Sequence, residues 1–144
     1  MIRLFATALL IATLSGCSLF VPREGLNMDG ALVNDYHAQV IADDWAQILT
    51  ERFVVETIFS ITGSGAITQA FTKSMRTGGY GVATDDQLIE SAIPIEIRTG
   101  NLDNGVVVSL IMKSEIMSRS YRIDDKKSIQ PNSQISMIVI RDSK

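Results

Sequence analysis

Cysteine, histidine and basic charge are scarce in this chain of 144 residues, and each shortage excludes a class of protein. With one cysteine, no internal disulfide can form. One histidine and one cysteine cannot supply the four ligands of a zinc site. The formal net charge of −3 lacks the basic excess that is typical of nucleic-acid-binding proteins. We therefore expect no cofactor, no metal ion and no direct contact with nucleic acid.

Long apolar segments are also lacking, except for one near the N-terminus. Residues 4–14 form an apolar run of eleven residues that follows the positive charge of Arg3. A membrane-spanning helix needs about 20 apolar residues, so this run is too short to cross a bilayer. Its length and its flanking charge are typical of a secretory signal peptide.

The residues that follow this run, Leu14, Ser15, Gly16 and Cys17, resemble the bacterial lipobox. In that motif a peptidase cuts before the cysteine, and the thiol takes diacylglycerol. Residues 1–16 are therefore predicted to be a lipoprotein signal peptide, with Cys17 as the lipidation site. Acylation also explains an otherwise free cysteine in an exported chain. The alternatives are an ordinary cleaved secretory signal and a short membrane anchor.

The lipid anchor has consequences for localisation. One acyl chain holds a protein to a membrane only weakly, and mature bacterial lipoproteins typically carry more than one, commonly including palmitate. Ser18 follows the cysteine at the position where Asp would usually cause retention at the inner membrane. The resemblance to sorted lipoproteins therefore predicts the outer membrane, with the protein facing the periplasm.

Cleavage before Cys17 would leave 128 residues, enough for one domain and a tether. Residues 17–34 contain Pro22, Gly25 and Gly30 and show no sustained periodicity, so they are predicted to be the acylated cysteine and a linker. Residues 35–144 are predicted to form a single domain. An apolar content of 46% is sufficient for a compact core.

A first helix is predicted over residues 35–52, where apolar residues recur three and four positions apart and form one stripe. Asn34 or Asp35 is the expected N-cap. Trp45 lies on the apolar stripe, which favours a core position over a role as a partner anchor.

A second helix is predicted over residues 66–76, with Ser64 as its N-cap and Gly78 and Gly79 as its left-handed C-terminal cap. The preceding Gly63-Ser64-Gly65 has neither the Gly-Lys-Ser/Thr of a P-loop nor the third spaced glycine of a dinucleotide site. It is therefore interpreted as a turn between a strand and the helix.

The rest of the domain is predicted to be mostly β, because β-branched residues and alternation dominate it. Pro94 lacks an amide donor, so its strand should begin there or lie at a sheet edge. Asp103-Asn104-Gly105 is a predicted turn, since Asn and Gly tolerate positive φ. The expected fold class is α+β, a two-layer sandwich with two helices on one face of a mostly antiparallel sheet. The predicted strands are 53–61, 80–83, 93–98, 106–112, 114–123 and 135–140, with an exposed turn at 124–127.

No catalytic constellation is evident. A hydrolytic triad would need a nucleophile and an acid near the single His37, and no G-x-S-x-G motif is present. His37 is predicted to be a solvated surface residue. Adjacent carboxylates occur at 43–44, 85–86 and 124–125, but neighbouring side chains point in different directions and make no acid/base pair. We expect no enzymatic activity; a lipoprotein hydrolase would require a Ser or Asp that converges on His37.

Several segments together resemble the TrbH-type lipoproteins of conjugal transfer (type IV secretion) systems. The layout of lipobox, linker, amphipathic segment, apolar strand and helix ending in a Gly-Tyr strand is similar, and the resemblance touches most of the mature chain. The resemblance implies no enzymatic activity, no cofactor and no catalytic residues. The segments that carry it are Ala42-Asp43-Asp44, Phe59 to Ile61, Ala70 to Val82 and Ser118-Arg119-Ser120-Tyr121-Arg122.

Two functional hypotheses follow. The first is an outer-membrane lipoprotein that serves as a structural subunit of a conjugative apparatus, in contact with its protein subunits; contact with copies of itself within the complex is compatible with this hypothesis. An exposed sheet edge at residues 94–98 or 135–141 would allow strand addition to a partner. The alternative is a stand-alone envelope lipoprotein that binds a small ligand or an envelope protein, which predicts a concave apolar pocket.

Overall fold

The computed structural model describes residues 33–83, 87 and 89–141. The predicted signal peptide, Cys17 and almost all of the linker lie outside the described residues, as does the Asp85-Asp86 pair. Within the described part, no helix is both long enough and apolar enough to cross a membrane.

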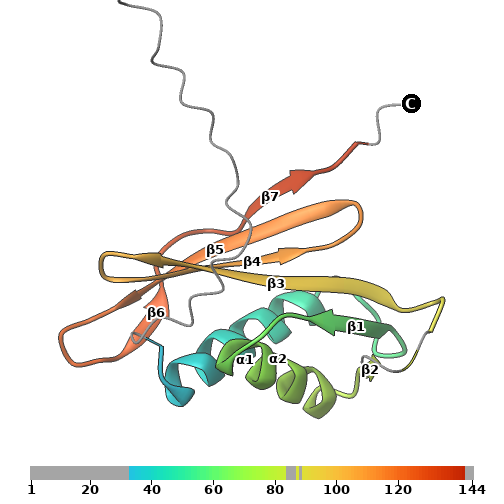
Figure 1. Cartoon of the computed structure of the whole chain (residues 1–144), viewed down its shortest axis with the longest axis horizontal. Helices are drawn as coiled ribbons and strands as arrows, with labels where there is room; N and C mark the ends of the chain where they lie inside the picture. Colours follow the sequence, from blue (N-terminus) through green and yellow to red (C-terminus); the bar gives the residue numbers. More distant parts are fainter. Residues whose placement is uncertain (1–32, 84–86, 88, 142–144) are drawn as a thin grey trace, which may run out of the picture.

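The described chain folds as two helices against one sheet (Figure 1). The strand order is β2-β1-β3-β4-β5-β6, and β7 also pairs with β5. Strand β1 runs parallel to β2 and β3, and all other pairs are antiparallel. The predicted α+β sandwich is confirmed. Its elements are α1 (Asp35–Thr50), β1 (Ile58–Thr62), α2 (Ala66–Thr77), β2 (Gly81–Ala83), β3 (Ile93–Leu102), β4 (Gly105–Ile111), β5 (Glu115–Ile123), β6 (Ile129–Pro131) and β7 (Ser136–Val139).

The core lies between the helices and the sheet. Trp45 from α1, Phe71 from α2 and Leu110 from β4 are among its fully buried side chains. Trp45 therefore has the core position that its place on the apolar stripe predicted. Phe59 from β1 packs edge-on against Phe53 and Tyr80, which closes the core beside α2.

The helix ends follow the predictions in part. Asn34 caps α1 by accepting a hydrogen bond from the His37 amide at 2.9 Å. At α2 the predicted cap was wrong, because Gly65, with φ 88°, is the N-cap and makes no side-chain cap bond. Of the two predicted left-handed glycines after α2, only Gly79 (φ 91°) has that conformation.

Strand boundaries differ more from the predictions. The strand predicted from residue 53 begins only at Ile58, because the chain first turns after α1, with the Thr57 amide bonded to the Val54 carbonyl. Val54 and Val55 are consequently exposed. Strand β6 was not predicted, since three residues are too few to show a period.

Pro94 is the second residue of β3, so that strand begins one residue before the proline, close to the predicted start. In the sheet order β3 sits between β1 and β4, but the pairing is staggered, so that Pro94 pairs with β1 alone and Arg98 with β4 alone. Residues 94–98 therefore belong to an internal strand and not to an outermost one, which makes them the less accessible of the two predicted sites for strand addition. Strand β7, by contrast, pairs with β5 alone among the described strands.

The turn between β3 and β4 is present, but its physical reason differs from the predicted one. Neither Asn104 nor Gly105 has a positive φ. Gly105 is needed because β4 and β5 approach closely there: a Cβ on Gly105 would overlap the backbone carbonyl oxygen of Tyr121.

Candidate functional site

His37 is buried, with 2% of its surface exposed, so the prediction of a solvated histidine was wrong. Its Nε2 lies 2.7 Å from the Lys127 carbonyl oxygen in the β5–β6 turn. Because a carbonyl only accepts, Nε2 carries the proton and donates it. Nδ1 faces the Asn34 amide and completes a capping box. The histidine thus ties the start of α1 to the sheet.

The adjacent carboxylates Asp43 and Asp44 diverge, as predicted for neighbours on a helix. Asp43 Oδ1 accepts hydrogen bonds from the hydroxyl of Ser74 at 2.7 Å and the amide of Gln39 at 2.8 Å. This cluster joins α1 to α2. Asp44 instead faces the sheet.

Asp44 is the centre of a polar cluster between α1 and β5. Arg119 Nη1 lies 2.8 Å from both Asp44 carboxylate oxygens, and the Tyr121 hydroxyl donates to Oδ2 at 2.6 Å. Arg119 Nε also donates to the Ser133 carbonyl at 3.1 Å, in the connection between β6 and β7. We call Asp44, Arg119 and Tyr121 the α1–β5 cluster.

The environment of this cluster keeps Tyr121 neutral. Burial raises the pKa of the Tyr121 hydroxyl far above its ordinary value, and the hydrogen bond to Asp44 and the charge of Asp44 raise it further. The positive charge of Arg119 lowers it in part. An uncharged, buried hydroxyl that donates to a carboxylate acts here as a structural anchor.

The α1–β5 cluster was not predicted, although its three residues lie in segments that carried the family resemblance. Arg119 and Tyr121 are two positions apart on β5 and so lie on the same face of the sheet. A polar pair on the face toward a helix could have indicated a carboxylate partner. The sequence alone did not reveal which of the two aspartates would face it.

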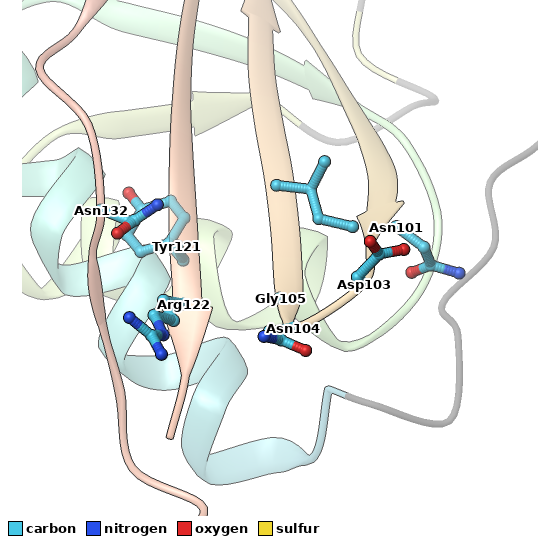
Figure 2. A pocket seen from close by; sticks show the side chains of 8 residues that line it. Asn101, Asp103, Asn104, Gly105, Tyr121, Arg122 and Asn132 are labelled. Carbon is cyan, nitrogen blue, oxygen red and sulfur yellow. The ribbon is translucent and has the colours of Figure 1, made fainter. Parts of the chain in front are cut away.

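An open groove of about 590 Å³ lies at the end of the sheet where the β3–β4 turn meets β5 and the residues after β6 (Figure 2). Asn101, Asp103 and Asn104 line one side, and Arg122 and Asn132 line the other. Its lining is mainly polar, unlike the apolar pocket that the small-ligand alternative predicts. Within the described part of the chain, no group of three His, Cys, Asp or Glu side chains could hold a metal ion.

Strand β7 is the most apolar exposed element of the described chain. Met137, Ile138 and Val139 have exposed fractions of 50%, 61% and 63%. Figure 1 shows β7 running outward from the sheet toward the C-terminus. Because Met117, the partner of Met137, faces the core, Met137 lies on the helix side and Ile138 on the open side. Both faces of β7 are thus exposed.

The geometry defines a class of protein: a small α+β domain whose polar clusters join its helices to its sheet and whose last strand offers an apolar edge. Residues 22–141 match the model of the family described as conjugal transfer protein TrbH. The chain therefore belongs to the TrbH family and is a conjugal transfer protein. No curated protein and no solved structure matches it.

Proposed function

We propose that this protein is a lipid-anchored, non-enzymatic structural subunit of a conjugative DNA-transfer (type IV secretion) apparatus. It is attached through Cys17 to the outer membrane and faces the periplasm. The observation that carries the proposal is the family match over residues 22–141, which begins shortly after the predicted lipobox at residues 14–17. The family match supports membership in the transfer apparatus, and the lipobox supports lipid anchoring through Cys17.

The contacts of the titratable residues support a structural role. His37 is engaged by the helix cap and by the Lys127 carbonyl, Asp43 by α2, and Asp44 by β5. These contacts join elements of the fold. We propose that the domain meets its neighbours by strand addition at β7, because of the two predicted segments only this one forms a strand with a single partner strand among the described residues.

The proposal is tested by DNA-transfer frequency in the native host after deletion of the gene, with wild-type and Cys17→Ala copies added back. Transfer should fall on deletion, and only the acylatable copy should restore it. Radiolabelled palmitate should enter the wild-type protein and not the variant. Transfer that is unchanged by deletion would remove the proposed role.

A Ser18→Asp copy is the matched control, because it keeps the acylated cysteine and changes only the residue that directs sorting. If the outer-membrane site matters, this copy should be lipidated, retained at the inner membrane and defective in transfer. Full transfer activity of Ser18→Asp would show that the protein needs a lipid anchor but that either membrane can hold it.

A further inference from the structure

We propose that the occupant of the β7 edge is β7 of a second copy of this chain, paired antiparallel about a two-fold axis at Ile138. This inference rests on the strand addition proposed above and names its partner. It is carried by the hydrogen-bonding direction, the side chains and the charge of β7.

Among the described residues, the backbone of β7 has one edge without a partner strand, and the residues that direct their hydrogen-bonding groups to this edge can be assigned. The Ile140 amide donates to the Ser114 carbonyl at 2.8 Å, in register with the pairing of Ile138 with Ile116. Even-numbered residues of β7 therefore direct their backbone groups to β5. Because the direction alternates along an antiparallel strand, Met137 and Val139 direct theirs outward.

Because only the odd-numbered residues direct their backbone groups outward, two copies of β7 can pair only in registers that place an odd-numbered residue opposite another odd-numbered residue. With Ile138 on the axis, Met137 of each copy pairs with Val139 of the other, so both outward residues of β7 are used. Ile138 then faces its own symmetry mate at a non-hydrogen-bonded position, where Cα atoms are about 4.5 Å apart.

The side chains on the open face continue across this axis. Ile111, Ile116 and Ile138 occupy directly paired positions on β4, β5 and β7, so they form a row that ends at the free edge. A second copy extends the row with its own three isoleucines. Cross-strand apolar pairs of this kind stabilise a sheet.

The β7 segment carries no charged residue that would repel a second copy and prevent this pairing. No charged residue occurs between Ser128 and Ile140, and Arg141 would lie opposite Ile135 of the other copy, so no like charges meet. The other edges carry protective features: β2 has only three residues, and β6 contains Pro131. Strand β7 has four residues and contains neither a proline nor a charged residue, as is expected of an edge that is normally paired.

The test is disulfide cross-linking of the full-length protein in the native envelope. An Ile138→Cys variant should form a covalent dimer under mild oxidation, because two cysteines at this spacing meet the geometry of a disulfide. Val139→Cys is the matched control, since its exposure is nearly equal but its counterpart across the axis is Met137. It should remain largely monomeric.

Each outcome decides the inference. Equal amounts of dimer from both variants would indicate random collision and would overturn the inference. A monomer from Ile138→Cys would show that no second copy lies at this edge, and it would overturn the inference as well. An adduct of another mass would also overturn it, while leaving strand addition and the proposed function intact.

Discussion

At the scale of single residues, Asp44 holds more of the fold together than its neighbour Asp43. We predict that Asp44→Asn lowers the free energy of unfolding by about 2 kcal/mol, because Arg119 and Tyr121 lose a charged acceptor in a partly buried site. Urea denaturation measures this cost. Asp43→Asn should cost about 1 kcal/mol, since its partners Ser74 and Gln39 are uncharged. Equal costs would contradict the special role of Asp44.

Tyr121 gives the fold a defined sensitivity to alkali. Its pKa is raised in the folded state by burial and by Asp44, whereas an unfolded tyrosine ionises near pH 10. The stabilisation from the neutral hydroxyl is therefore complete below about pH 10 and is lost above it, at about 1.4 kcal/mol per pH unit. Denaturation between pH 8 and 11 should show this loss in the wild type and a smaller one in Tyr121→Phe. Parallel curves would refute the assignment.

His37 acts as a helix-capping residue and as a tie to the β5–β6 turn. His37→Ala should destabilise the protein by about 1–2 kcal/mol, because it removes half of the capping box and the bond to the Lys127 carbonyl. His37→Gln separates the two effects, since Gln also completes a capping box. Thermal unfolding should place Gln between His and Ala. If Ala matched the wild type, neither contact would contribute.

At the scale of elements, the close approach of β4 and β5 makes Gly105 sensitive to any side chain. Gly105→Ala is expected to cost about 3 kcal/mol or to prevent folding, because the new Cβ overlaps the Tyr121 carbonyl, a backbone atom that cannot rotate away. Gly100→Ala, also in the β3–β4 hairpin, is the control. Its Cβ meets only a methyl group of Val107 at 3.0 Å, so its cost should be small. Circular dichroism melting of both variants would decide.

The helices were predictable and the strand edges were not, for a physical reason. A stripe such as that around Trp45 repeats over sixteen residues of α1 and fixes both the element and its buried face. In residues 53–57 the alternation of β-branched residues has no such support, and the chain turns there instead. The prediction that His37 is solvated was wrong because the burial of a polar residue depends on a partner distant in sequence, here Lys127. The α1–β5 cluster was missed for the same reason.

At the scale of the whole molecule, the two clusters and the His37 tie make one rigid unit of the helices and the sheet. Asp43 joins α1 to α2, Asp44 joins α1 to β5, and His37 joins α1 to the β5–β6 turn. Helix α1 therefore takes part in all three of these polar contacts, which connect it to α2, to β5 and to the β5–β6 turn. None of these three contacts involves β7. The side chain of Arg52 does reach this strand, since its Nη1 lies 3.3 Å from the sulfur of Met137. The edge proposed for assembly can thus be altered with little effect on the rest.

This separation permits a test of assembly that does not depend on stability. Val139→Pro removes an outward-facing amide of β7 and leaves the Ile140 amide free to bond Ser114. The variant should unfold at nearly the wild-type temperature, yet its transfer frequency and its copurification with the transfer complex should fall severalfold. Val139→Thr keeps the amide and the β-branched shape, so it should behave as wild type. Normal transfer by Val139→Pro would show that the β7 edge is not where this subunit meets its neighbours.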